Sequence, residues 1–117
     1  QELAPLVDEN GTLVIQDGAY EGTEEELSIF MDDVNMLVRP DICILWVYPH
    51  DIWHASVDVM VRRTIDAHAG AHRSAIVDWS AAVQADPSLT HDGLHPSVNH
   101  GDHVLASLMH EAVQHCD

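Results

Sequence analysis

The apolar, β-prone run at 42–48, which reads ICILWVY, restricts the fold of this chain more than any other feature. A strand that is apolar at every position is buried on both faces, and such strands are typical of parallel sheets covered by helices. Apolar residues with helical spacing precede the run at 27–38 and follow it at 57–68. Strands that alternate with helices of this length predict βαβ units with right-handed crossovers. The sequence therefore predicts an α/β fold in which 42–48 is an internal strand.

Short local signals mark where the elements begin and end. Thr23 and Glu26 have the spacing of a capping box, and Arg39-Pro40 ends the helix that this box begins. Gly70 is a natural end for the second helix. The predicted order is a strand at 12–15, a helix with its apolar stripe at 27–38, the strand at 42–48, a helix with its stripe at 57–68, a strand at 75–79, a polar loop at 80–97 and a helix with its stripe at 104–113.

The carboxyl ends of the predicted strands lie at 16–18, 49–51 and 79–80. In parallel α/β folds, ligands bind at this edge of the sheet. At least three strands are predicted, with helices on both faces, and the strand at 12–15 would present an apolar edge without a neighbour. We therefore expect self-association, a partner chain or further upstream strands to cover that edge.

Charge excludes several classes of partner. The 117 residues favour a single domain, 1–117, and contain 20 acidic side chains against 4 basic ones, a formal net charge of −16. This charge argues against nucleic acids and anionic membrane surfaces as ligands, and it is also typical of salt-adapted proteins. We interpret the acidic residues at 21–33 as a solvated helix face. No apolar run is long enough for a transmembrane helix and no leader is visible, so we expect no membrane contact by this segment.

The two cysteines, Cys43 and Cys116, do not make a disulfide framework by their number. Cys43 falls within the apolar run at 42–48, where we expect a buried and chemically inert thiol. Trp46 and Trp79 are predicted to belong to the core.

The most specific chemical signal is the segment HDGLHPS at 91–97, in the loop before the last helix. Across one turn, the carboxylate of Asp92 can hold the ring nitrogen of His95 that faces it and so fix the tautomer of the ring. The other ring nitrogen is then available to take a proton from a nucleophile. Gly93 permits the tight turn that this pairing needs. Asp92 and His95 are therefore the candidate catalytic residues.

Three segments together resemble the motifs of the SGNH, or GDSL-like, hydrolases: LVIQ at 13–16 followed by Gly18, IVDW at 76–79, and DGLHP at 92–96. The chain looks most like the soluble domains at the C-terminus of bacterial membrane acyltransferases. The resemblance implies a flavodoxin-like three-layer α/β/α fold and ester hydrolysis or O-acyl transfer, without a cofactor, on small or carbohydrate substrates. It also implies that Asp92 orients His95, that His95 is the general base, and that a domain attached to such an acyltransferase is extracytoplasmic.

The chain departs from that family at its nucleophile. The family serine stands in a G-D-S motif after the first strand, and this sequence has no such motif, so the family's first two strands are missing. Where the third block of the family reads G-x-N, this chain has Gly18-Ala19-Tyr20. Tyr20 thus stands in the place of the oxyanion donor, with Gly18 beside it. A base without a nucleophile does not make a triad, so we expect the isolated chain to be inactive.

Four residues after the central strand fall at the expected ligand edge and are candidates for lining the substrate site: His50, Asp51, Trp53 and His54. The alternative for this segment is a loop whose tryptophan, Trp53, anchors it on the core. The 10 histidines raise the question of a metal, but no H-E-x-x-H motif is present and zinc sites need three or four close protein ligands. We interpret the histidines as solvated and expect no metal site.

Two functions from different classes remain open. The first is part of an SGNH-type esterase or O-acyltransferase domain that carries Asp92 and His95 but not the serine. The second is a degenerate, non-enzymatic SGNH-like module used for binding or oligomer assembly. A metal-binding acidic protein is a weaker third possibility. A G-D-S motif in the upstream coding sequence would separate the first two.

Overall fold

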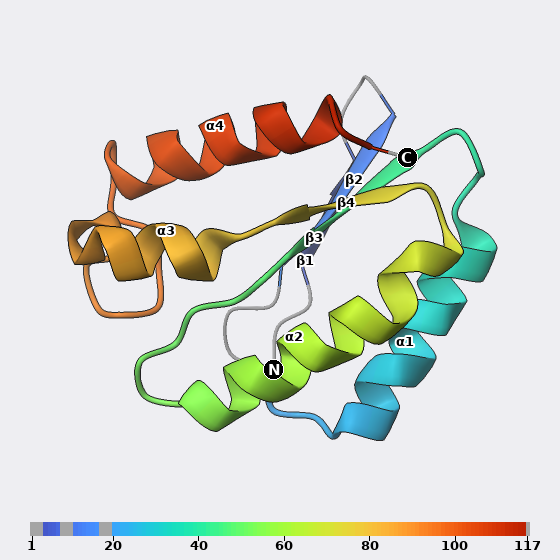
Figure 1. Cartoon of the computed structure of the whole chain (residues 1–117), viewed down its shortest axis with the longest axis horizontal. Coiled ribbons are helices and arrows are strands. Elements are labelled where there is room, and N and C mark those ends of the chain that lie inside the picture. Colours follow the sequence, from blue (N-terminus) through green and yellow to red (C-terminus); the bar gives the residue numbers. More distant parts are fainter. Residues whose placement is uncertain (1–3, 8–10, 17–19, 117) are drawn as a thin grey trace.

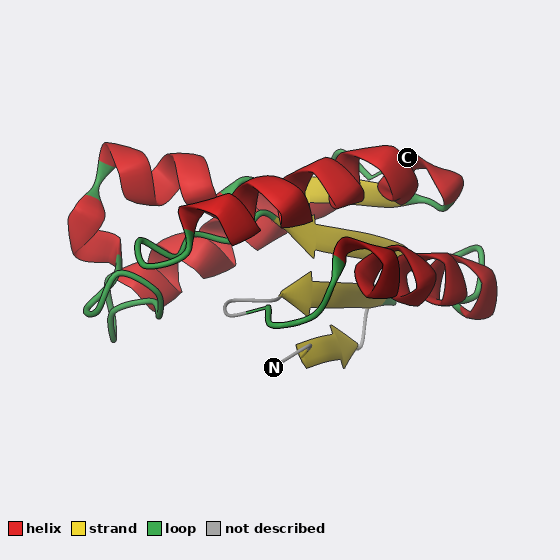
Figure 2. Ribbon diagram, turned by 90° about the horizontal axis from the view of Figure 1, so that it is seen from below, coloured by secondary structure: helices red, strands yellow, loops and turns green. Residues whose placement is uncertain are grey.

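A four-stranded sheet with the order β1-β2-β3-β4 forms the middle layer of the computed structural model, which describes residues 4–7, 11–16 and 20–116. Strands β2, β3 and β4 are parallel, with Ile15 opposite Trp46 and Trp46 opposite Ile76. The arrow of β1 points the other way, because β1 pairs with β2 in the antiparallel direction (Figure 2). The strands are β1 (Ala4–Val7), β2 (Thr12–Gln16), β3 (Cys43–Val47) and β4 (Ser74–Val77).

Two helices cover each face of the sheet (Figure 1). Alternate residues of the fully buried β3 point into two cores, so that Ile44 and Trp46 pack with α1 and α2 while Leu45 and Val47 pack with α3 and α4. The predicted flavodoxin-like α/β fold with a three-stranded parallel sheet is confirmed. The helices are α1 (Glu24–Leu37), α2 (Ala55–His68), α3 (Trp79–Ala85) and α4 (Gly101–Val113), with short 3₁₀ turns η1 (Ala69–Ala71) and η2 (Pro87–Leu89).

The predicted capping box at the start of α1 is confirmed. The Thr23 hydroxyl accepts a hydrogen bond from the Glu26 N–H at 3.1 Å, and the Glu26 carboxylate accepts one from the Thr23 N–H at 2.9 Å. Leu27 and Met31 of the predicted apolar stripe are buried, whereas Leu37 is 78% exposed because α1 ends there. None of the described helices is both long and apolar enough to cross a membrane.

Strand β1 corrects the prediction of an uncovered edge at 12–15. Pro5 of β1 lies opposite Ile15, so that β2 is paired on both sides within this chain. The strand escaped prediction because it has only four residues and contains a proline, which strands tolerate mainly at sheet edges. The expectation of an oligomer or a partner chain rested on an uncovered β2 edge, and β1 covers that edge.

Helix α3 corrects the predicted strand at 75–79 and the predicted loop at 80–97. Strand β4 ends at Val77, and Trp79 begins the helix instead of ending the strand. The Asp78 carboxylate caps the helix by accepting a hydrogen bond from the Ala81 N–H at 2.9 Å. Trp79 and Val83, one turn apart, are buried. A helix of seven residues is too short to reveal its period in the sequence.

Cys43 and Cys116 form a disulfide, so the prediction of an inert thiol at Cys43 is wrong. Cys43 is buried as predicted, but α4 brings the end of the chain back to the start of β3, where the two Cα atoms are 6.2 Å apart. The sequence separation of 73 between the cysteines explains why the pairing could not be predicted locally. Trp46 and Trp79 belong to the core as predicted, each 2% exposed.

Salt is expected to raise the melting temperature of this chain. With a formal net charge of −16 and only 4 basic side chains, the compact state is strained by repulsion among its carboxylates. Dissolved ions screen that repulsion over about 10 Å at 0.1 M. Thermal unfolding followed by circular dichroism from low to molar sodium chloride is the measurement. A melting temperature that does not change over this range would contradict the expectation.

Candidate functional site

Asp92 and His95 form a hydrogen-bonded pair in the loop between η2 and α4. Nδ1 of His95 lies 2.6 Å from Oδ2 of Asp92, while Oδ1 accepts hydrogen bonds from the N–H groups of Leu94 at 2.9 Å and His95 at 2.7 Å. Gly93 makes the turn with a φ of 85°, a conformation that favours glycine. The spacing therefore does bring the carboxylate and the ring together, as the sequence predicts.

These donors hold the pKa of the Asp92 carboxyl well below its usual range, the side-chain hydrogen bond from His95 first and the backbone hydrogen bonds after it. Because the pKa is lowered in the fold, the stabilisation is fully present above the ordinary pKa of an aspartate. It is lost as the pH falls from there toward the lowered value. Asp92 is thus a carboxylate throughout the pH range in which a histidine works as a base.

The loop that carries this pair is attached to the loop after β3. The Ile52 N–H donates to the Gly93 carbonyl at 3.2 Å, and the indole N–H of Trp53 donates to the Asp92 carbonyl at 3.2 Å. Both loops lie at the same end of the sheet, where β3 and β4 terminate (Figure 1). The His95 side chain is 65% exposed, and its Nε2 makes no hydrogen bond within 4–7, 11–16 and 20–116. A reacting hydroxyl could therefore approach that nitrogen from solvent.

A second Asp–His pair, Asp51–His54, lies in the loop after β3. The sequence placed both residues at the ligand edge, but their pairing was not predicted. Nδ1 of His54 is 2.8 Å from Oδ2 of Asp51, and the other carboxylate oxygen accepts a hydrogen bond from the Trp53 N–H at 2.9 Å. The signal was present, because residues 51–54 read D-x-x-H just as 92–95 do. Asp51 differs from Asp92 in being buried, with 4% exposure, and its own N–H donates to Asp58 at 2.7 Å.

This network fixes Asp51 as a structural anchor at the start of α2. Burial raises the pKa of Asp58, which the hydrogen bond from the Asp51 N–H partly offsets. Trp53 connects the two pairs, since its backbone N–H donates to Asp51 and its indole N–H to the Asp92 carbonyl. The two Asp–His pairs are therefore held together as one unit at the carboxyl edge of the sheet.

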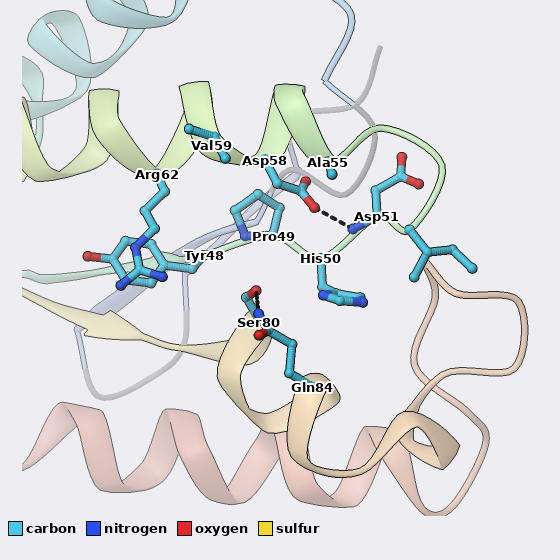
Figure 3. A pocket seen from close by; sticks show the side chains of 11 residues that line it. Tyr48, Pro49, His50, Asp51, Ala55, Asp58, Val59, Arg62, Ser80 and Gln84 are labelled. Carbon is cyan, nitrogen blue, oxygen red and sulfur yellow. Dashed lines mark hydrogen bonds between the residues drawn. The ribbon is translucent and has the colours of Figure 1, made fainter.

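His50 stands where two adjoining cavities meet, of about 240 and 370 Å³. Ile52 and Gln84 also line both, and His91 lines the larger one. Figure 3 shows the smaller cavity, between α2 and α3, with His50 and Ser80 on its walls. The structure thus brings His50 to a hollow beside the Asp92–His95 loop, as a substrate-lining residue requires.

Tyr48 and Arg62 close the other end of the smaller cavity (Figure 3). The Arg62 guanidinium lies 4.5 Å from the centre of the Tyr48 ring, and the Tyr48 hydroxyl donates to Asp66. Burial, and then the hydrogen bond to Asp66, raise the pKa of Tyr48 to about 12. At physiological pH the Tyr48 phenol is therefore neutral, so Tyr48 lines the cavity as a hydrogen-bonding residue and does not act as a base.

The predicted oxyanion residues are placed differently. Gly18 lies outside the described residues. Tyr20 is buried and lines a cavity of about 360 Å³ with Asp51 and His54, but its hydroxyl donates to the Thr23 carbonyl at 2.7 Å. Because a phenol has one donor hydrogen, Tyr20 in this arrangement cannot also donate to an oxyanion.

No serine or threonine hydroxyl is hydrogen-bonded to His95 in the part of the chain that the structure describes. The nearest serine in sequence, Ser97, is engaged elsewhere, since its hydroxyl donates to the Ser88 carbonyl and accepts from the Gly101 N–H. Ser80 lines the smaller cavity and accepts a hydrogen bond from Gln84 at 2.9 Å. The described residues thus place a carboxylate on Nδ1 of His95, with no serine or threonine hydroxyl hydrogen-bonded to the ring.

Comparisons of this chain with protein-family models, with curated proteins and with solved structures find no match.

Proposed function

We propose that this chain is part of an SGNH-type esterase or O-acyltransferase domain and supplies its Asp–His pair. The observation that carries the proposal is the contact between Nδ1 of His95 and Oδ2 of Asp92, at the carboxyl edge of a parallel sheet. An ionised carboxylate on Nδ1 leaves the lone pair of Nε2 on the outer side of the ring. This is the arrangement a histidine needs in order to act as a general base.

In the proposed reaction, Nε2 of His95 takes the proton of a serine hydroxyl as that hydroxyl attacks the carbonyl carbon of an ester. Asp92 holds the Nδ1–H and stabilises the imidazolium that forms. The proton then passes from His95 to the leaving alkoxide, and the acyl group stays on the serine until water or an acceptor hydroxyl removes it. The nucleophilic serine of the G-D-S motif is absent from these 117 residues, so the isolated chain is inactive in this proposal.

The cavities beside the pair support an ester or O-acyl substrate with hydroxyl groups, such as an acylated carbohydrate. Their walls combine an imidazole from His50 with hydroxyl and amide groups from Ser80 and Gln84. Trp53, 72% exposed next to the Asp92 carbonyl, adds an apolar surface. Such a mixture of apolar walls with a few polar groups is typical of small-molecule sites.

The disulfide between Cys43 and Cys116 supports an extracytoplasmic location. Disulfides form and persist in oxidising compartments and are rare in the cytosol. This agrees with a domain attached to a membrane acyltransferase.

Two measurements test the proposed function. The purified chain is incubated with a fluorophosphonate probe, which labels activated serines, and with a short-chain nitrophenyl ester. We expect no labelled serine and no turnover near the enzyme-like rate of about 1 s⁻¹. The coding sequence ahead of Gln1 is expected to contain a strand followed by G-D-S, and a product that includes it should be labelled at that serine.

Other outcomes would change the proposal. If the 117-residue chain is itself labelled, mass spectrometry identifies the serine, and the missing-nucleophile part of the proposal is wrong. If the longer product contains G-D-S but is neither labelled nor active, the alternative of a degenerate binding or assembly module is favoured.

A further inference from the structure

We propose that His91, Asp92 and His95 form a binding site for one divalent transition-metal ion such as Zn²⁺, and that the bound ion and the Asp92–His95 hydrogen bond exclude each other. One ligand atom from each of the three residues lies within 4.8 Å of the other two. Within the described part of the chain, this is the single group of three or more such side chains that meets that spacing. The sequence analysis interpreted the histidines as solvated and kept metal binding only as a third possibility, so this group of three residues was not predicted.

The spacing of the ligand atoms suits a tetrahedral ion. Oδ2 of Asp92 lies 2.6 Å from Nδ1 of His95 and 3.9 Å from Nε2 of His91. Zinc binds imidazole nitrogen and carboxylate oxygen at about 2.0–2.2 Å, which places neighbouring tetrahedral ligands about 3.3–3.5 Å apart. The Asp92–His95 distance is shorter than this spacing, and the Asp92–His91 distance is longer. Small rotations of the two exposed rings would therefore complete the site.

The backbone holds the ligands in place before any ion binds. Thr90 and Pro96 form an antiparallel bridge, so His91 and His95 stand next to each other on the two arms of the loop. Their rings are stacked, with centroids 6.0 Å apart and an angle of 18° between the planes. The two backbone hydrogen bonds to Oδ1 of Asp92 fix the carboxylate and leave Oδ2 for the shared contact. A site ordered in this way loses little conformational entropy on binding.

The ligand chemistry favours a transition metal over calcium or magnesium. Imidazole suits zinc, copper and nickel, whereas calcium and magnesium prefer oxygen ligands. Three protein ligands leave the fourth tetrahedral position to water or to another small molecule. The formal net charge of −16 attracts cations in general. The two imidazoles are what would select a transition metal from among them.

Mutual exclusion follows from the protons on His95. When Nδ1 donates to Oδ2 of Asp92, it carries a hydrogen, and the lone pair of the ring is on Nε2. An ion bound at Nδ1 needs the lone pair there, so the hydrogen of the neutral ring must move to Nε2. The metal-bound ring then has no site that can accept a proton. Metal binding itself is independent of the proposed function, but its consequence, that the ion switches off the base, rests on it.

Zinc titration of the purified chain by isothermal calorimetry tests the site. His91→Ala removes one ligand and leaves Asp92 and His95 in place, whereas His103→Ala removes an exposed histidine of α4 outside the group. We expect one strong site per chain, weakened at least about tenfold in His91→Ala and unchanged in His103→Ala. Circular dichroism melting establishes that both variants are folded. Absence of binding, or equal weakening by the two substitutions, would overturn the metal site.

Nitrogen NMR of the His95 ring gives a second readout. In metal-free protein we expect the hydrogen on Nδ1, and in zinc-bound protein on Nε2. His91→Ala should keep the metal-free pattern at zinc concentrations that saturate the parent. A metal-free ring with its hydrogen on Nε2 would overturn both the proposed function and the mutual exclusion. Failure of zinc to bind while Nδ1 carries the hydrogen would overturn the metal site alone.

Discussion

Replacing Cys116 with serine is expected to lower the free energy of unfolding by about 4 kcal/mol. The disulfide to Cys43 closes a loop across 73 residues, most of the chain, and so restricts the unfolded ensemble strongly. It also ties the end of α4, which covers one face of the sheet, to the start of the internal strand β3. The melting temperature is expected to fall by roughly 10–20 °C for a domain of this size. Urea and thermal unfolding of the two proteins give both quantities.

Reductant provides the matched control for this substitution. The reduced parent protein should melt near the melting temperature of Cys116→Ser, because both lack the Cys43–Cys116 disulfide. The melting temperature of the variant should not change with reductant, because the variant has no disulfide to reduce. A parent protein that melts at the same temperature with and without reductant would contradict the expected stabilisation. Mass spectrometry after alkylation shows in each case whether Cys43 and Cys116 are bonded.

Those features that depend on neighbours in sequence could be predicted. The run at 42–48 became the buried strand β3 because every position in it is apolar, which leaves no face for solvent. The Thr23–Glu26 capping box and the Asp92–His95 contact each join residues three apart, so their spacing alone limits where the side chains can reach. Parallel sheet, layer order and the position of the Asp92–His95 loop follow from such local signals.

What escaped prediction depends on contacts that are distant along the chain or on elements too short to show a period. The disulfide needs α4 to return to β3, which local sequence does not encode. Strand β1 is stabilised by its pairing with β2, and helix α3 is stabilised by the burial of Trp79. The Asp51–His54 pair is a different case, because its D-x-x-H spacing is the same as that of Asp92–His95 and is sufficient to predict the contact.

The two Asp–His pairs allow a sharp test of which histidine acts as the general base in the proposed reaction. In a version of the protein that carries the serine nucleophile, His95→Ala is expected to lower kcat by about 10⁴–10⁶-fold, the loss typical when a triad base is removed. His54→Ala is the matched control, because it removes an equally exposed ring from an aspartate at the same spacing and a similar distance. We expect that control to change kcat by less than about tenfold, since Asp51 is committed to anchoring α2. Steady-state hydrolysis of a nitrophenyl ester measures both.

The surroundings of the two aspartates favour His95 over His54 as the general base of the proposed reaction. Asp51 is buried and is hydrogen-bonded to Trp53 and Asp58 at the start of α2. The His54 ring is therefore bonded to an aspartate that has a structural role. Oδ1 of Asp92 accepts hydrogen bonds within the turn that carries His95, and the hydrogen bond from the His95 ring to Oδ2 lowers the pKa of Asp92.

Replacing Asp92 with asparagine should therefore reduce kcat of the serine-containing protein by about 10⁴-fold, because an asparagine side chain at this position would favour the wrong tautomer of His95. If His54→Ala instead lowers kcat more than His95→Ala, then Asp51–His54 is the catalytic pair. The Asp92–His95 loop would then have a role in metal binding or in stabilising the fold.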